Sequence, residues 1–341
     1  MSNFWPHEND AAEQLPARRR TPLVKVFDTD AAHDAFEAEN SQSTRRETLN
    51  RLRTSGPDRT LTLIQPSMLD QLDCMVESQP NFAPVIDHLR RQLALCRLAL
   101  PPVLQWAPLL LDGPPGIGKT FFARTLAEVL ETEFAVINCS SVTASFVLGG
   151  NSPSWQGSRP GRVYEVLQGG SCANPIVLLD EVDKLSTDAR FDGYGPLYQL
   201  LETGTAREFV DEHVGLPMDA SHIVWIATSN NADALPGPIR SRFDVITVDG
   251  PSAKDLKAIA QSVYAGILAQ NPGWSAAFRA KLPDHVLNRL AGMPPRSIRK
   301  RLIDAMGAAA LQRKGRNRLV PDAGGTDSNN LNSRRSIGFL G

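Results

Sequence analysis

Short apolar runs alternate with amphipathic segments between residues 105 and 250. The apolar runs predict buried strands at Leu109–Leu111, Phe134–Asn138, Ile176–Leu179, Ile223–Ala227 and Val245–Val248. Segments between them, such as Lys119–Glu131, have the periodicity of helices. Strands that are separated by helices pair in parallel through right-handed crossovers. We therefore predict an α/β domain over residues 105–250, with a parallel sheet flanked by helices.

The pattern becomes all-helical in residues 251–314, with prolines between the apolar repeats. We expect a small helical lid domain there. Upstream of the sheet, Leu89, Leu93 and Cys96 recur at the spacing of three to four residues that is typical of a helix. Residues 61–104 are therefore predicted to form a helical linker in front of the α/β domain.

Both ends of the chain are polar and irregular. A helix is possible over Ala31–Arg53, but Thr54-Ser-Gly-Pro57 would end it. We expect residues 1–60 to be an arm that is flexible or is ordered by a partner, because they are polar and irregular. Residues 315–341 are rich in Gly, Asn and Ser, and we expect them to be a disordered tail.

The composition is that of an ordinary globular protein. Charged residues make up 21% of the 341 residues and the net charge is −1, so nothing draws the whole chain to nucleic acid or to an anionic membrane. No apolar run reaches the length of a membrane-spanning helix, and the N-terminus lacks the apolar core of a secretory signal. The four cysteines are widely spaced without a CxxC pair, which favours the reducing cytoplasm.

A glycine-rich loop follows the first predicted strand of the α/β domain and precedes a predicted helix. Its residues fit the phosphate-loop pattern at every fixed position; they are Gly113, Pro114, Pro115, Gly116, Ile117, Gly118, Lys119 and Thr120. Glycines let backbone N–H groups turn toward phosphates, and the helix N-terminus attracts negative charge. Lys119 would reach the β- and γ-phosphates of ATP, and the Thr120 hydroxyl would ligate Mg²⁺.

Two carboxylates end the apolar run Ile176–Leu179. In isolation, Asp180 and Glu181 would be an ordinary solvated strand end. Behind a phosphate loop they have a specific chemistry, because carboxyl ends of parallel strands meet at one edge of the sheet. Asp180 would hold the Mg²⁺ shell, and Glu181 would polarise the attacking water.

Three further polar segments follow. Asn230 ends a predicted strand, where its amide could position a water molecule, although, taken by itself, this segment is better explained as a strand-end turn. Arg240 and Arg242 follow a Pro-Gly-Pro turn and are either partners in a surface ion pair or a source of positive charge for a neighbouring subunit's site. Pro295–Arg299 opens a helix of the small domain.

The order and spacing of these segments resembles the AAA+ ATPases, and within them most resembles the ATPase module of Lon-type proteases. The resemblance covers residues 108 to about 306 and includes three less generic stretches, Ser154–Arg162, Leu179–Lys184 and Leu235–Ile239. It implies a homo-oligomeric ring, expected to be a hexamer, that binds ATP and Mg²⁺ and hydrolyses ATP at subunit interfaces.

The resemblance also implies roles for single residues. Asn230 would be the first sensor of the γ-phosphate, and Arg242 the arginine finger that acts in a neighbouring subunit. Arg296 would be the second sensor, contacting the γ-phosphate from the small domain of the same subunit. Arg240 is the less favoured finger.

Two departures from Lon-type modules stand out. Trp155 keeps the aromatic character of the position where such modules usually carry Tyr, but Gln156 replaces an aliphatic residue. Only about 35 residues follow residue 306, too few for a peptidase domain. We therefore expect a Lon-like motor without its own protease domain.

Trp155 favours a motor that remodels protein clients through a central pore. It lies in a glycine-rich loop, where an exposed tryptophan would be unusual. The alternative for this residue is a tryptophan packed under its own loop. The alternative for the whole protein is a motor or loader on nucleic acid, favoured by basic residues such as Arg299 and Lys300, although such a run is more often a solvated helix face. A nucleotide switch without turnover is disfavoured by Glu181.

The tripeptide Ile337-Gly-Phe339 resembles a peptide with which some AAA+ unfoldases dock a separate peptidase. In those unfoldases it lies in a loop of the ATPase domain, whereas here it is near the chain end. Three-residue motifs recur by chance, so a partner-docking tail is the less favoured interpretation.

Overall fold

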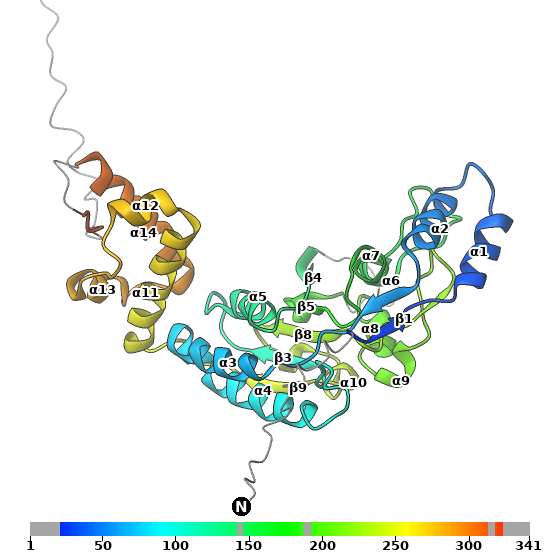
Figure 1. Cartoon of the computed structure of the whole chain (residues 1–341), viewed down its shortest axis with the longest axis horizontal. Helices are drawn as coiled ribbons and strands as arrows, with labels where there is room; N and C mark the ends of the chain where they lie inside the picture. The colour runs from blue at the N-terminus through cyan, green and yellow to red at the C-terminus, as the bar shows by residue number, and fades with distance from the viewer. Residues whose placement is uncertain (1–20, 142–145, 187–191, 313–317, 323–341) are drawn as a thin grey trace, which may run out of the picture.

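The centre of the structure is a sheet of parallel strands (Figure 1). The computed structural model describes residues 21–141, 146–186, 192–312 and 318–322. The strand order is β4-β5-β8-β3-β9, and the strands are β3 (Leu109–Asp112), β4 (Phe134–Asn138), β5 (Ile176–Asp180), β8 (Val224–Ser229) and β9 (Asp244–Thr247). The predicted α/β class with a parallel sheet is confirmed.

The residues of each central strand alternate between two apolar cores. In β3, Leu110 belongs to one core, whereas Leu109 and Leu111 belong to the other. In β5, Val177 and Leu178 divide in the same way. Both faces are covered, so these strands consist of unbroken apolar residues and do not alternate with polar ones.

Helices cover both faces of the sheet (Figure 1). Those on the first core are α6 (Phe146–Gly149), α7 (Arg162–Gly169), α8 (Gly195–Leu200), α9 (Thr203–Ala206) and α10 (Gly237–Arg240). Those on the second core are α3 (Pro66–Ser78), α4 (Ala83–Cys96) and α5 (Lys119–Val129). Since α3 and α4 share a core with the sheet, residues 66–96 are an integral part of the nucleotide domain and not a spacer.

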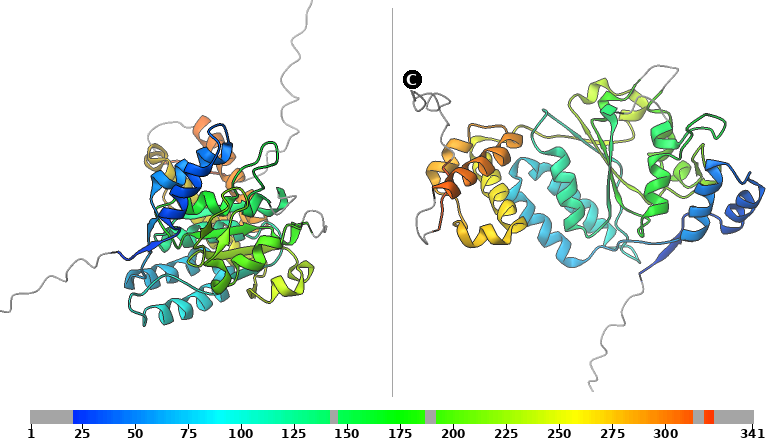
Figure 2. Two further views of the ribbon diagram at one scale, coloured as in Figure 1. Left: turned by 90° about the vertical axis from the view of Figure 1, so that its right-hand side faces the viewer. Right: turned by 90° about the horizontal axis from the view of Figure 1, so that it is seen from above.

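A separate helical domain follows the sheet and lies at one end of the molecule (Figure 2). Its helices are α11 (Ala253–Gln270), α12 (Pro272–Ala277), α13 (Asp284–Leu290) and α14 (Pro295–Leu311). Tyr264, Val286 and Leu302 are central to its own apolar core. None of the helices in the described ranges combines the length and the apolar character needed to cross a bilayer.

The expectation of a flexible arm is wrong for residues 21–60. They form β1 (Leu23–Lys25), α1 (Thr29–Ala38), α2 (Thr44–Ser55) and β2 (Asp58–Thr60). We call this the N-terminal unit. Strands β1 and β2 pair with each other, and Phe27 pairs with Met218, in a short hairpin formed by β6 (Phe209–Val210) and β7 (Pro217–Met218). Residues 1–20 lie outside the described part.

The N-terminal unit folds because the nucleotide domain supplies the core that it lacks. Val26, Leu49 and Leu52 are fully buried in the first core of the sheet. Local signals for its helices were present, since Asp28 and Ser43 cap the N-termini of α1 and α2 with their side chains. The composition of this segment predicted flexibility because it contains few apolar residues. Those residues are buried against partners that lie far away in the sequence.

The tail prediction needs a correction over a few residues. The backbone N–H of Leu319 donates to the carbonyl oxygen of Ala277 at 2.8 Å, and Arg289 forms an ion pair with Asp322. Residues 318–322 are thus folded onto the small domain. The rest of the predicted tail, including Ile337-Gly-Phe339, falls outside the described residues.

Leu52→Ala tests whether the N-terminal unit shares the core of the nucleotide domain. Leu52 is fully buried, so we expect the truncation to lower the free energy of unfolding by about 2–5 kcal/mol. The control is Leu95→Ala, because the side chain of Leu95 is 62% exposed and its loss should change stability by about 0.5 kcal/mol or less. Denaturant unfolding measures both, and equal small effects would mean that residues 21–60 fold independently of the core.

Candidate functional site: a nucleotide site at the carboxyl edge of the sheet

The phosphate loop connects β3 to the first turn of α5. Gly116 and Gly118 have φ values of +80° and +104°, in the left-handed region that glycine adopts without strain. Gly113 is in close contact with the backbone beside β9, since a Cβ built on it would lie 2.2 Å from the carbonyl oxygen of Val248. Only glycine fits that position, so the start of the loop is held against the sheet.

Lys119 is buried at the start of α5 and faces into the loop. Its Nζ donates to the carbonyl oxygens of Gly113 at 2.6 Å and Pro114 at 3.0 Å, and to Oδ1 of Asn230 at 3.1 Å. Burial lowers the pKa of Lys119, while nearby carboxylates, Asp112 first among them, act in the opposite direction. The structure thus brings together the predicted phosphate-binding lysine and the predicted sensor amide.

Asp180 ends β5 beside the first turn of α5. Its Oδ1 accepts hydrogen bonds from the hydroxyls of Thr120 at 2.9 Å and Thr228 at 2.7 Å. A threonine hydroxyl beside one carboxylate fits Mg²⁺, which usually takes one or two protein carboxylates together with phosphate oxygens. No group of three His, Cys, Asp or Glu side chains in the described residues could hold a metal ion.

Glu181 follows directly and has a strained backbone. Its φ of +57° is unusual for a residue with a side chain. Its N–H donates to the hydroxyl of Thr228 at 2.9 Å, and this bond helps to hold the conformation. The Thr228 hydroxyl therefore links the two acidic residues, because it accepts from the N–H of Glu181 and donates to the carboxylate of Asp180.

Sequence reasoning missed Thr228 and two other supports of the site. Asp112, at the end of β3, accepts from the hydroxyl of Ser229 at 2.5 Å and ties β3 to β8. The ring of Phe82 stacks on that of Phe122 in α5, with centroids 4.5 Å apart. The sequence signal for Thr228 was its place two residues before Asn230, at the end of an apolar run.

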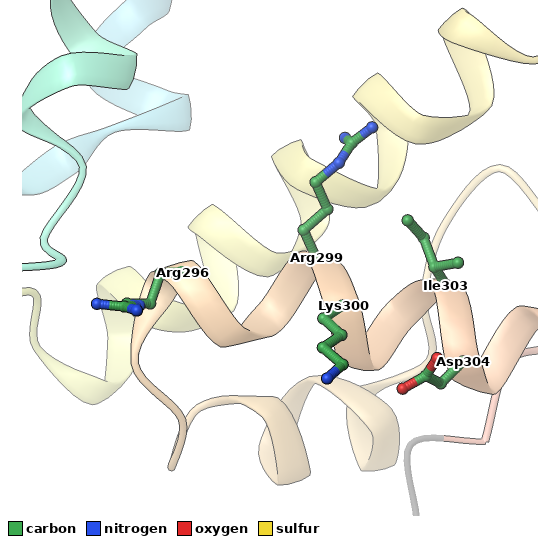
Figure 3. Close-up of a pocket in the computed structure, with 5 residues that line it drawn as sticks. All are labelled: Arg296, Arg299, Lys300, Ile303 and Asp304. Carbon is green, nitrogen blue, oxygen red and sulfur yellow. The ribbon is translucent and has the colours of Figure 1, made fainter.

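Arg296 brings the small domain to the phosphate loop. A Cβ built on Gly116 would lie 3.2 Å from Cδ of Arg296, so this side chain packs against the loop. Figure 3 shows Arg296 at the start of α14, pointing away from Arg299 and Lys300. These three residues line a hollow of about 320 Å³ together with Ile303 and Asp304.

The two candidate finger residues have their polar contacts elsewhere in the chain. Arg242 forms an ion pair with Glu202 at 2.8 Å and donates to the carbonyl oxygen of Pro238 at 2.6 Å. Arg240 pairs with Asp233 at 2.7 Å. In the part of the chain that the structure describes, these contacts are with residues outside the phosphate loop.

Trp155 lies in a surface loop between α6 and α7, and its side chain is 61% exposed. The loop is nevertheless ordered by its own bonds. The N–H of Arg159 donates to Oδ1 of Asn151 at 2.8 Å, and Trp155 bonds through its backbone to Ser152 and Ser158. The alternative of a tryptophan packed under its own loop is thereby excluded.

The sequence model of the family described as "ATPase family associated with various cellular activities (AAA)" matches residues 109–249. These are the residues that form the central sheet and carry the phosphate loop, Asp180 and Glu181. Residues 109–249 therefore form an AAA-type ATPase module. The small helical domain and the parallel sheet agree with this assignment, and the predicted P-loop ATPase class is confirmed.

Among the proteins that this chain resembles in sequence are Lon proteases. It is 30% identical over 177 residues to the Lon protease of Aquifex aeolicus, which covers 52% of this chain and 22% of that protein. It is 28% identical over 246 residues to Lon protease 2 of Myxococcus xanthus. That alignment covers 68% of this chain and 28% of the Myxococcus protein. The chain thus spans about a quarter of the length of these relatives.

A solved structure shares the fold. A chain of the closed-state reconstruction of Hsp104 with ATPγS and casein superposes with a TM-score of 0.56 at 17% identity, covering 76% of this chain and 54% of that one. The resemblance to the ATPase module of Lon-type proteases is confirmed by the sequence relatives, and the Hsp104 chain supports the fold.

Replacing Thr228 tests the shared hydroxyl at the site. Thr228→Val keeps the shape but removes the bonds to Asp180 and Glu181, so we expect kcat for ATP hydrolysis to fall roughly 10- to 100-fold. Thr228→Ser retains the hydroxyl and should stay within about threefold of the original rate. Steady-state phosphate release measures the rate of both variants. Equal rates would show that the Thr228 hydroxyl is not needed for ATP hydrolysis.

Proposed function

We propose that this chain assembles into a homo-oligomeric ring, hydrolyses ATP with Mg²⁺, and uses the energy to remodel or unfold protein clients in a central pore. The observation that carries the choice of client is the exposed Trp155 on an ordered loop of the ATPase domain. Tryptophan is enriched at surfaces that contact another protein.

The nucleotide chemistry follows from residues that lie together at the carboxyl edge of the sheet. Lys119 and the loop N–H groups would bind the β- and γ-phosphates, and Mg²⁺, held by Thr120 and Asp180, would neutralise their charge. Glu181 would accept a proton from the attacking water. Asn230, which contacts Lys119, would orient that water beside the γ-phosphate.

Arg296 would link the small domain to the state of the nucleotide. Its side chain packs on the loop at Gly116, so a γ-phosphate in the loop would attract it. Hydrolysis removes that phosphate and weakens the attraction. The small domain would then change its position relative to the sheet, and this movement is what a motor of this kind transmits to its neighbours.

The ring is inferred from Arg242. Its ion pair is with Glu202, whose side chain is 50% exposed, so the guanidinium is close to a surface that a second subunit could approach. An arginine supplied across an interface stabilises negative charge in phosphoryl transfer. Each site would then be complete only when two subunits meet.

Three properties of the wider protein belong to the same proposal. The four cysteines are free thiols, which suits a reducing cytoplasm. The activity that we propose is remodelling without peptide-bond cleavage by this chain, since the polar residues gathered at its site serve the nucleotide. Among the basic residues on α14, Arg299 already has a partner within the small domain, since it donates to Oε1 of Gln270 at 2.9 Å. Nucleic acid is therefore the less favoured client.

The decisive experiment measures the ATPase rate alone, with an unfolded protein, and with single- or double-stranded DNA at matched salt. We expect stimulation by the unfolded protein only. Stimulation by DNA alone would overturn the choice of client and favour a motor on nucleic acid. A rate that neither ligand changes would argue against remodelling, while leaving the nucleotide site itself intact.

Trp155→Ala tests client gripping at the loop. Since the side chain is exposed, its removal should shift the melting temperature by about 2 °C or less and leave the basal ATPase rate unchanged. Stimulation by the unfolded protein should be lost. Trp155→Tyr is the control, because it keeps an aromatic ring and should retain most of the stimulation. If the unfolded protein stimulates the ATPase rate of Trp155→Ala fully, Trp155 does not bind the client.

Complementation between variants tests the finger in trans. We expect Arg242→Ala to be inactive alone and Glu181→Gln to bind ATP with very slow turnover. A mixture of the two should recover part of the activity, because some interfaces pair an intact Glu181 with an intact Arg242. Arg240→Ala is the matched control and should remain active. If mixing restores no ATPase activity and the specific rate of the original chain does not depend on protein concentration, the proposal of a site shared between subunits is wrong.

A further inference from the structure

The loop that carries Trp155 is closed at its base by one carboxylate. The N–H of Gly161, at the C-terminal end of the loop, donates to Oδ2 of Asp211 at 2.7 Å. At the other end, a Cβ built on Gly150 would lie 2.3 Å from Oδ1 of the same side chain. Both ends of the loop therefore pack against Asp211, and the space beside Gly150 admits no larger residue.

Asp211 is itself fixed in the turn between β6 and β7. It is fully buried, and its Oδ1 also accepts from the backbone N–H groups of His213 at 2.9 Å and Val214 at 3.1 Å. Burial raises the pKa of Asp211 to about 6, although these N–H bonds act in the opposite direction. Next to it, the N–H of Glu212 donates to the carbonyl oxygen of Gly149 at 2.7 Å. We call residues 211–214 the Asp211 turn.

The N-terminal unit contacts the other side of the Asp211 turn. Arg45 of α2 donates through Nε to the carbonyl oxygens of His213 and Val214, both at 3.1 Å, and through Nη2 to that of Val214 at 2.8 Å. The hydroxyl of Thr48 lies 3.2 Å from Nε2 of His213. Tyr164 of α7, the helix that follows the loop, donates to the carbonyl oxygen of Thr48 at 3.0 Å.

We propose that the N-terminal unit positions the Trp155 loop for client binding through the Asp211 turn, with Asp211 as the positioning residue. The path is continuous, from α2 through the turn to the two ends of the loop, and coupling is carried by such contiguous contacts. The inference rests on the proposed function in one respect, because it takes Trp155 as the client-binding residue.

The position of the N-terminal unit supports a role separate from nucleotide binding. In Figure 2 the unit, in blue, lies at the opposite end of the molecule from the small helical domain. Apart from an ion pair with Glu39 inside the unit, the side-chain bonds of Arg45 within the described residues are to the Asp211 turn and not to the phosphate loop. A change in the unit would therefore alter the grip on a client without altering the basal rate of hydrolysis.

Two neighbouring arginines on α2 provide a matched pair for the test. Arg45 binds the Asp211 turn, whereas Arg46 donates to the carbonyl oxygens of Phe36 at 2.6 Å and Glu39 at 2.7 Å, in and beside α1. Arg45→Met and Arg46→Met remove the same charge from the same helix. Only Arg45→Met removes the bonds to the turn, and it also removes an ion pair between Arg45 and Glu39. A loosening that follows from the loss of positive charge on α2 alone would affect both variants equally.

The full chain would be studied by hydrogen–deuterium exchange of peptides spanning residues 150–161, together with ATPase assays on an unfolded protein. In Arg45→Met we expect faster exchange in that loop, a rise in the client KM of roughly 3- to 30-fold, and an unchanged basal rate. Arg46→Met should show neither change. Asp211→Asn should also speed exchange in the loop, because an amide nitrogen cannot accept from a backbone N–H.

Two outcomes would overturn the proposal. One is faster exchange in residues 211–215 of Arg45→Met with unchanged exchange in residues 150–161, since the turn would then move without the loop. The other is the same response in Arg46→Met as in Arg45→Met. If the unfolded protein fails to stimulate even the original chain, the proposed function is wrong, but the exchange measurement still decides whether the N-terminal unit positions the loop.

Discussion

The parallel pairing of β5, β8 and β3 determines where the strand-end residues of the nucleotide site lie. In this register Leu111 is opposite Thr228 and Leu179 is opposite Ala227, so the three strands end at one edge. The side chains that follow then come within hydrogen-bonding distance. Displacing β8 by one residue would exchange its two faces and would remove the Thr228 hydroxyl from Asp180.

Much of this site was accessible from the sequence because its signals are local. A phosphate loop depends on glycines at fixed spacing, and Asp180 and Glu181 stand directly after an apolar run. The bonds of Lys119 to the loop and to Asn230 bring together residues that were predicted separately. Thr228 could not be chosen in this way, because a threonine within a strand is ordinary until the neighbouring strand ends opposite it.

The N-terminal unit is the instructive failure of the prediction. Its own apolar residues are too few for a core, and a composition argument that treats a segment in isolation must find it flexible. Leu49 and Leu52 become buried only because the sheet presents a surface to them. Arg45 donates hydrogen bonds to carbonyl oxygens more than 160 residues away in the sequence. A pattern of neighbouring residues cannot predict such a contact.

The backbone of Glu181 carries a consequence for anyone who would engineer this chain. A side-chain-bearing residue at φ +57° is held in a conformation that glycine or asparagine adopts more readily. A redesign guided by folding stability alone would therefore select against glutamate at this position. With the proposed role of Glu181 in hydrolysis, stability and activity make opposite demands on this one residue. Directed evolution for thermal resistance would then retain the glutamate only if ATP turnover were selected at the same time.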